Sequence, residues 1–236
     1  MQDKIATGCD SIDKLLEGGI SRGSLSLVYG EPETGKTTFA IQCAVNCARQ
    51  GLKALFVDCD ATFHPRRLAQ IAGEGLEKIS ELTVLMRPTR FSEQTAIIDR
   101  LAEYTSKNFG LVVFDTVTSL YRLETAETPA KIFDLNRELN RQIAVLAQIA
   151  KTQQIAVLLT SQVRAAFVQA TVSIEPVATR VLKFWADMII NMKLTEKSGI
   201  VQAVLEKSSS NMPLQTCYLR IREDGIVSCP NLSKAA

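Results

Sequence analysis

The segment Gly30–Thr37 constrains this sequence most, because it reads GEPETGKT and matches the pattern G-x-x-x-x-G-K-[ST]. A strand candidate at 24–29 precedes it, and a helix candidate at 36–50 begins inside it. Glycines let a loop backbone wrap around a phosphate, so that backbone N–H groups and the helix N-terminus face its oxygens. We expect Lys36 to reach the β- and γ-phosphates of a nucleotide and the Thr37 hydroxyl to bind Mg²⁺. The residues expected to bind the nucleotide here are Gly30, Glu31, Pro32, Glu33, Thr34, Gly35, Lys36, Thr37 and Thr38.

Strand and helix candidates alternate along most of the chain. Further strands are expected at 53–58, 82–86, 111–114 and 155–160, and further helices at 92–107 and 128–154. Such alternation predicts the α/β class, with a mostly parallel sheet flanked by helices. From Met188 onward the short segments MIINMKL, IVQAVLE and TCYLRI predict antiparallel strands that extend the sheet. We interpret residues 1–236 as a single domain, which the length permits.

Composition excludes several classes of protein. Hydrophobic residues make up 46% of the chain and charged residues 22%, which excludes a disordered chain. The net charge of +2 is too small to coat nucleic acid by charge alone, so any such contact must be local. No apolar stretch approaches the roughly 18 residues of a membrane span, and no signal-peptide pattern is present, so a cytoplasmic protein is expected. The six cysteines include no C-x-x-C pair and are interpreted as reduced core residues.

Polar side chains stand at the carboxyl ends of the strand candidates. Asp115 closes an apolar run and is expected to hold Mg²⁺ together with Thr37, the alternative being an ordinary acid at a strand end. Asp58 and Asp60 follow another run, where a carboxylate can either orient an attacking water or cap the next helix. Gln162 follows a third run and can sense a γ-phosphate. These groups should converge on one edge of the sheet, where open α/β folds bind ligands.

Beyond the loop, the recognisable segments are VDCDATFHPRRL, VVFDTVTSLYRLE, LNRELNRQ and LLTSQV. With these segments the chain resembles the family of RecA-type recombinases, and most of all its archaeal RadB branch, from Thr7 to about Pro230. The resemblance implies a RecA-like P-loop NTPase core. It implies catalytic roles for Gln162 and for Asp60, which occupies the place of the family's water-activating glutamate and is one methylene shorter. It also implies that the Arg67 guanidinium stacks on adenine, which suits a planar cation.

The resemblance also implies two loops that face DNA. Arg122 lies in the first, and the second runs from Arg164 to about Arg180. These arginines are expected to contact phosphates, with single-stranded DNA favoured, so affinity should be modest and sensitive to salt. Phe184 and Trp185 could stack on bases, although packing in the core is the interpretation we favour for both.

The function implied by the resemblance is that of an accessory protein in homologous recombination and DNA repair, with ATP and Mg²⁺ as cofactors. A shift of about 1 Å can cost about a hundredfold in rate, so the shorter Asp60 implies weak or absent ATP hydrolysis. The chain starts directly at Ile5-Ala6-Thr7-Gly8, without an N-terminal helical DNA-binding domain. Strand exchange and a filament built through such a domain are therefore not expected, while a homo-oligomer stays open. The expected protein partners are a RadA-type recombinase and a Holliday-junction resolvase.

Two alternatives remain open at this point. The stretch EPETGKTTFAIQ is similar to the phosphate loop of KaiC-type ATPases, which implies a signalling ATPase that acts on protein partners. The second alternative is a binding module in which the nucleotide only stabilises the fold and is not hydrolysed.

Overall fold

The computed structural model describes residues 3–105, 108–168, 171–176, 178–208 and 214–229, and their side chains except at 164–168, 171–176 and 179. A small antiparallel pair comprises β1 (Lys4–Ile5) and β2 (Ile20–Ser21), and all other strands belong to one ten-stranded sheet. The strands of that sheet are β3 (Leu25–Gly30), β4 (Lys53–Asp58), β5 (Thr83–Met86), β6 (Phe109–Asp115), β7 (Ala156–Val168), β8 (Thr171–Pro176), β9 (Met188–Leu194), β10 (Ile200–Lys207), β11 (Gln215–Arg222) and β12 (Gly225–Ser228).

The sheet is parallel in one half and antiparallel in the other. Its order is β12-β11-β10-β9-β3-β7-β6-β4-β5, with β8 paired to β7 outside this path. All pairs from β9 to β5 are parallel, and β9 to β12 form antiparallel neighbours. The prediction of a mostly parallel α/β sheet extended by C-terminal antiparallel strands is therefore confirmed.

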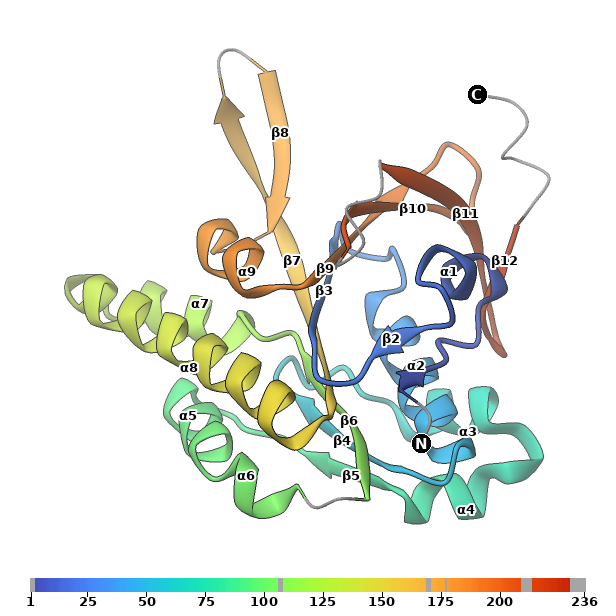
Figure 1. Cartoon of the computed structure of the whole chain (residues 1–236). Coiled ribbons are helices and arrows are strands. Elements are labelled where there is room, and N and C mark those ends of the chain that lie inside the picture. Colours follow the sequence, from blue (N-terminus) through green and yellow to red (C-terminus); the bar gives the residue numbers. More distant parts are fainter. Residues whose placement is uncertain (1–2, 106–107, 169–170, 177, 209–213, 230–236) are drawn as a thin grey trace.

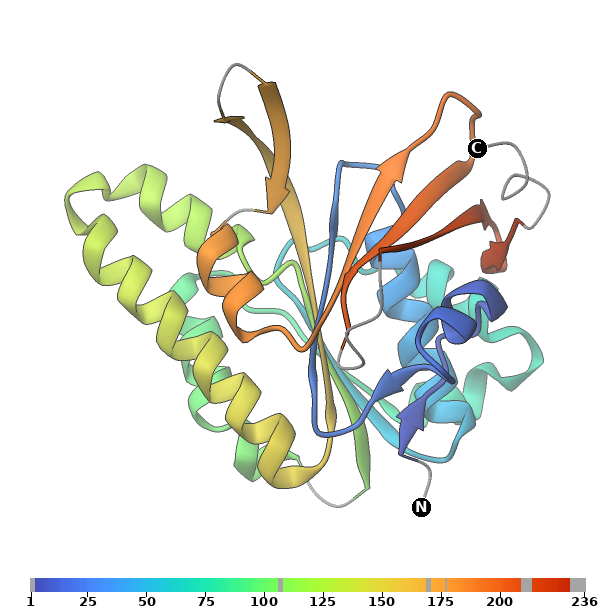
Figure 2. The same cartoon turned by 45° about the horizontal axis from the view of Figure 1, so that its top comes forward.

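Helices cover both faces of the sheet (Figures 1 and 2). One face carries α1 (Asp10–Leu15), α2 (Lys36–Arg49), α3 (Pro65–Ala72) and α4 (Leu76–Glu81), with the 3-10 turn η1 (Gly73–Gly75). The other carries α5 (Phe91–Asp99), α6 (Leu101–Tyr104), α7 (Ser119–Glu127), α8 (Ile132–Gln153) and α9 (Thr179–Trp185), with η2 (Pro129–Lys131) before α8. Each layer has its own hydrophobic cluster against the sheet.

Strand β3 illustrates why both clusters form. Its side chains alternate, so that Leu25, Leu27 and Tyr29 join the cluster under α8 while Val28 joins the one under α2. Because successive strand residues point to opposite faces, a strand covered on both faces is largely apolar. Ser26 is the polar exception in β3, and its hydroxyl is buried without a hydrogen-bond partner among the described residues.

The segment after Asp115 and the segment after Gln162 differ from expectation. Residues 119–127 form helix α7, which no pattern in the sequence predicted. The expected loop from Arg164 to Arg180 is instead a β-hairpin of β7 and β8 followed by α9, and the hairpin projects beyond the sheet (Figure 1). The reason is local, because this stretch is rich in the β-branched and aromatic residues that favour strands.

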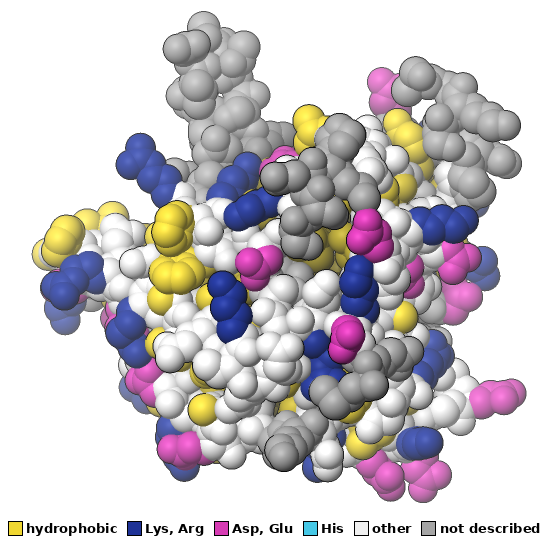
Figure 3. All heavy atoms as spheres, viewed as in Figure 1, with side chains coloured by type: hydrophobic (Ala, Val, Ile, Leu, Met, Phe, Trp, Pro, Cys, Tyr) yellow, Lys and Arg dark blue, Asp and Glu magenta, His cyan; other side chains and the backbone are white. Residues whose placement is uncertain are grey.

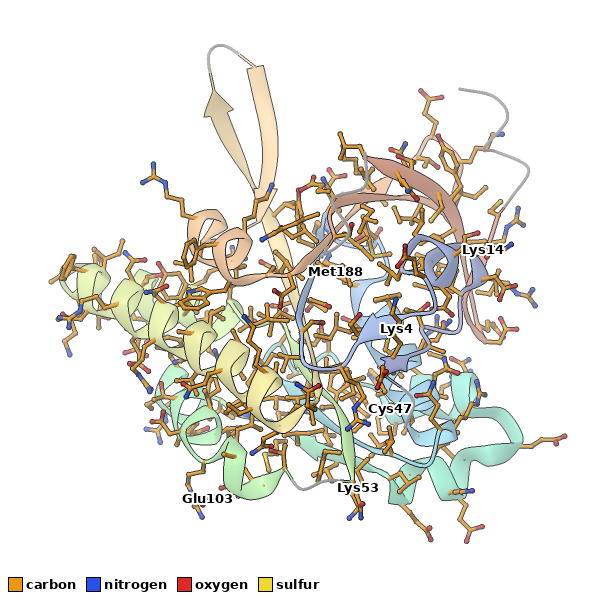
Figure 4. All side chains as sticks on the ribbon, in the orientation of Figure 1. Lys4, Lys14, Cys47, Lys53, Glu103 and Met188 are labelled. Carbon is orange, nitrogen blue, oxygen red and sulfur yellow. The ribbon has the colours of Figure 1, made fainter. Side chains whose placement is uncertain are left out.

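The parallel strands give the sheet two distinct edges. Figure 4 shows Lys53, the first residue of β4, at the end of the sheet far from the β7–β8 hairpin. The carboxyl ends of β3, β4, β6 and β7 therefore lie toward the hairpin, at one shared edge. Across the described residues, no helix combines the length and the apolar composition that a membrane crossing requires.

A buried glutamine joins α2 to the last strand. Gln42 is 4% exposed, and its side chain accepts a hydrogen bond from the Ile226 N–H at 2.6 Å and donates one to the Ile226 carbonyl at 3.0 Å. The edge strand β12 thus has its backbone groups paired by a side chain from the helix that begins at the glycine-rich loop. Gln42 therefore fixes the antiparallel half of the sheet to that helix.

Replacing Gln42 by alanine should destabilise the protein. Gln42→Ala leaves the buried N–H and carbonyl of Ile226 without partners, so we expect the free energy of unfolding to fall by about 2–4 kcal/mol in urea denaturation. The matched control is Gln148→Ala on the exposed face of α8, for which a change within about 0.5 kcal/mol is expected. Equal losses in the two variants would contradict the role given to Gln42.

Candidate functional site

The glycine-rich loop connects β3 to α2 in a space that admits backbone only. A Cβ on Gly30 would lie 2.1 Å from the Met192 carbonyl oxygen, which real structures do not permit. Gly35 has a φ of +85°, and a Cβ there would also lie 2.9 Å from Cδ1 of Ile221. The two glycines are thus required by contact with β9 and β11, and they leave the N-terminus of α2 open to a ligand.

Lys36 lies inside the loop, whereas the acidic Glu33 of the same loop is exposed. The Lys36 ammonium donates to the carbonyls of Gly30 at 2.9 Å and Glu31 at 2.6 Å, and its side chain is buried. Burial lowers the pKa of Lys36, and the charges of Asp115, Asp60 and Glu31 oppose that shift. Glu33 is exposed, with a φ of +65°. The positive charge is therefore the one that the loop presents inward.

Asp115 is a buried carboxylate with one unpartnered oxygen. It is 0% exposed at the end of β6, and its Oδ1 accepts a hydrogen bond from Thr160 on the neighbouring strand. Its Oδ2 is buried and accepts no hydrogen bond. Burial raises the pKa of Asp115, and the nearby hydroxyls of Thr160 and Thr37 oppose that rise. Oδ2 nevertheless has no hydrogen-bond donor. A carboxylate oxygen in this state fits a hard cation such as Mg²⁺, which prefers oxygen ligands.

The two aspartates after β4 have different surroundings. Asp58 is 0% exposed and accepts the backbone N–H groups of Thr62 and Phe63 together with the Arg87 guanidinium at 2.8 Å. It therefore shapes the turn after β4 and does not cap the next helix, because the N-cap of α3 is His64 and no side chain caps it. Asp60 is only partly buried, and one of its oxygens accepts the Thr116 hydroxyl at 2.8 Å. Of the two, only Asp60 can act on a ligand.

Arg67 projects from α3 toward the start of α2. Its guanidinium donates to the carbonyls of Arg222 and Glu223, both at 2.7 Å, and lies 3.4 Å from the Thr38 hydroxyl. The β11–β12 turn thus holds a planar cation beside the loop. This position is compatible with stacking on a nucleotide base.

The strand register brings the candidates together. Gly30 on β3 is the Cα partner of Gln162 on β7, and Asp58 on β4 is the partner of Asp115 on β6. The loop, the buried carboxylate, Asp60 and Gln162 therefore share one edge of the sheet. Thr160 was expected at this edge from the sequence, as the residue that ends the run at 155–160, but its bond to Asp115 was not expected. Thr116, which holds Asp60, was not singled out from the sequence.

The three arginines expected to contact DNA are placed differently. Arg122 is exposed in the first turn of α7, and its Nη1 donates to Gln162 Oε1 at 3.1 Å. Arg180 is exposed near the start of α9. The backbone of Arg164 lies in the hairpin opposite Glu175, and its side chain is outside the described residues.

The preference for core packing of Phe184 was wrong, and that for Trp185 was partly right. Phe184 is 74% exposed, because α9 turns it away from α8. Trp185 is half-buried, packs against the cluster under α8 and donates to Asn140 at 3.0 Å. Figure 3 shows hydrophobic side chains on the surface over α9 and over the α7–α8 end.

Comparison with known proteins places this architecture in one family. The Rad51 family model matches residues 3–229. The chain belongs to the Rad51 family. RadB of Thermococcus kodakarensis, named a DNA repair and recombination protein, is 36% identical over 94% of this chain and 98% of its own. The corresponding protein of Methanobrevibacter smithii is 31% identical, covering 95% of each chain.

A solved structure agrees with these sequence relatives. A crystal structure of the RadB recombinase superimposes with a TM-score of 0.81 at 33% identity, covering 95% of this chain and 99% of that one. The expected RadB-type family and the RecA-like fold class are therefore confirmed. The match over almost the whole chain decides in favour of the Rad51 family over the KaiC-type ATPases.

Asp115→Asn should leave the protein as stable as the wild type, or more stable, at pH 7. The folded state keeps a proton on Asp115 to a higher pH than the unfolded chain does. Ionisation of Asp115 therefore lowers the free energy of unfolding as the pH rises above about 4. Asparagine retains the oxygen that accepts the Thr160 hydroxyl and has no charge to bury. Thermal melts from pH 3 to 8 should show the two proteins diverging as the pH rises.

Asp58→Asn is the matched control, because Asp58 is an equally buried carboxylate at the neighbouring strand end. Its ion pair with Arg87 and its two backbone donors are lost or weakened in the variant. We expect a loss of about 2–3 kcal/mol at pH 7. A comparable loss for Asp115→Asn would contradict the description of Asp115 as an under-satisfied carboxylate.

Proposed function

We propose that this chain is an ATP-binding and DNA-binding accessory protein of homologous recombination and DNA repair. The observation that carries the proposal is the juxtaposition of Lys36 in the glycine-rich loop with Asp115, whose Oδ2 is buried and unpartnered. The names of the RadB relatives as DNA repair and recombination proteins support the biological setting. We place the protein in the cytoplasm, in accord with six free cysteines.

The residues at the sheet edge fit ATP together with Mg²⁺. The backbone N–H groups from Gly30 to Thr38 and the Lys36 ammonium would bind the phosphates, and Arg67 would stack on the adenine. Thr37 and Asp115 would hold the cation, whose chemistry when bound is to neutralise charge on the phosphates. The unpartnered Asp115 oxygen gives an independent reason for a cation here, since an unpaired buried carboxylate oxygen is costly.

Hydrolysis should be weak. Asp60 would orient the attacking water, and its reach is one methylene short of the glutamate in related recombinases. Its carboxylate is also held by the Thr116 hydroxyl at 2.8 Å, and Thr116 in turn lies 2.7 Å from the Ser119 hydroxyl. Because Thr116 holds the Asp60 carboxylate, this side chain has little freedom to move toward the glycine-rich loop.

DNA binding would be local and sensitive to salt. We propose Arg122, Arg164 and Arg180 as phosphate contacts, because Arg122 follows Asp115 in the chain, and Arg164 and Arg180 follow Gln162. Exposed Phe184 adds a surface on which a base can stack, which favours single-stranded DNA. With a net charge of only +2, neutralisation of a few phosphates would account for the affinity.

Protein partners complete the proposal. A single ATP-binding core with weak hydrolysis suits a role beside a RadA-type recombinase, or beside a Holliday-junction resolvase, better than strand exchange of its own. Association with such a partner, or between copies of this chain, can be measured by sedimentation with and without ATP.

Asp60→Glu should raise ATP turnover. The longer side chain restores the missing reach, so we expect at least about a tenfold increase in the rate of phosphate release with single-stranded DNA present. Asp60→Asn is the control, since it keeps the size of the side chain and the contact with Thr116 but cannot accept a proton. Turnover of the glutamate variant at the wild-type rate would show that reach is not what limits hydrolysis.

A further inference from the structure

A cavity of about 220 Å³ lies at the edge of the sheet opposite the glycine-rich loop. Ser26 near the start of β3 and Met188 at the start of the parallel strand β9 line it. The segment from β1 through α1 to β2 encloses the other sides, and Figure 4 shows Lys4 of that segment near Met188. Of the described residues that line the cavity, none belongs to the ATP or DNA sites proposed above. It is therefore a separate feature of the molecule.

The hydroxyl of Ser26 is the first sign that the cavity takes a ligand. Ser26 is 1% exposed, and its hydroxyl has no hydrogen-bond partner in the described part of the chain. The nearby Ser24 hydroxyl, by contrast, donates to the Ser21 carbonyl at 2.7 Å. A buried hydroxyl without a partner is unfavourable, because it has given up its hydrogen bonds to water. Rotation of the Ser26 side chain to another staggered position would let a polar molecule in the cavity supply the missing bond.

The charge of Asp187 is the second sign. Asp187 lines the cavity and is partly exposed, and its Oδ2 accepts the Leu25 N–H at 2.9 Å. Its carboxylate forms no ion pair with any cation of the described residues. Lys4 also lines the cavity, but its ammonium donates to the carbonyls of Leu16 at 2.7 Å and Glu17 at 3.1 Å. The cavity therefore presents a negative charge that the described chain does not neutralise.

Apolar side chains and the small volume restrict the ligand further. Leu16, Ile20 and Met188 are buried and line the cavity. Burial of methylene groups against such side chains is favourable. A volume of about 220 Å³ equals that of about seven water molecules at about 30 Å³ each, so it admits a molecule of about seven heavy atoms.

We propose that this cavity binds a small aliphatic amine that carries a neutral polar group at its other end. The ammonium pairs with Asp187, the neutral end bonds to Ser26, and the methylene groups between them pack on Ile20 and Met188. Asp187 repels an anion, and a wholly apolar molecule leaves both polar groups without partners. The site is independent of the proposed function, because Ser26 and Gly30 lie about 13 Å apart along β3.

The test is a titration of the full chain with 5-aminopentan-1-ol, which has the size and both polar ends that the cavity requires. We expect saturable changes in the amide NMR signals of Ser26, Asp187 and their neighbours, with a dissociation constant on the order of 1 mM for so small a ligand. Pentan-1-ol lacks the charge, and 5-hydroxypentanoate reverses it. Both should bind at least about tenfold more weakly.

Two variants assign the contacts. Asp187→Asn keeps an oxygen to accept the Leu25 N–H but removes the charge, so the probe should bind at least about tenfold more weakly. Ser26→Ala should weaken binding about three- to tenfold. Without the probe, Ser26→Ala should melt no lower than the wild type, because the unpaired hydroxyl is gone. The matched control is Asp134→Asn on the exposed face of α8, which should bind the probe as the wild type does.

The amine site is overturned if the wild type shows no saturable change at Ser26 and Asp187, or if Asp187→Asn binds the probe with full affinity. Equal binding of pentan-1-ol also overturns it, because the charge then has no role. A lysine side chain of another protein offers the same ammonium, so Nα-acetyl-lysine methylamide is titrated alongside. Tighter binding of this compound than of 5-aminopentan-1-ol would overturn a free small molecule as the ligand.

Discussion

Parallel pairing of β3, β7, β6 and β4 is the constraint on which the rest of the molecule depends. It places the carboxyl ends of four strands at one edge, so that Gly30 lies level with Gln162 and Asp58 level with Asp115. The strands are largely apolar on both sides because they are buried between two helical layers. The buried carboxylates of Asp58 and Asp115 lie where β4 and β6 end, so the candidate groups are concentrated at this edge.

The buried charged groups at this edge differ in how well the protein itself satisfies them. Asp58 has all its bonds satisfied within the protein and behaves as part of the framework. Asp115, one strand away and equally buried, keeps one oxygen without a partner, and Lys36 keeps a buried ammonium among loop carbonyls. Burial lowers the pKa of Lys36 and raises that of Asp115, so it disfavours the charged form of both groups. A ligand of opposite charge would stabilise each charged form. An anion beside Lys36 and a cation beside Asp115 are what a magnesium nucleotide provides.

Much of this could be predicted from the sequence, because the signals are local. The loop motif and the polar residue after each apolar run identified Lys36, Asp115 and Gln162 together with the edge that holds them. What could not be predicted depends on contacts between segments far apart in the chain. Helix α7 is fixed by bonds to β7 rather than by a clear apolar period, and the exposure of Phe184 depends on how α9 meets α8. The hairpin differs, because its β-branched and aromatic residues are a local signal that the expected loop did not take into account.

The most direct test of the account is calorimetric titration of the full chain with magnesium ATP. We predict one nucleotide bound per chain in the wild type, with binding about 10- to 100-fold weaker in Lys36→Ala, since one charge-assisted phosphate contact is lost. Lys53→Ala, at the opposite edge of the sheet, should bind as the wild type does. A folded wild type that takes up no nucleotide, or a Lys36→Ala protein with undiminished affinity, would contradict the account.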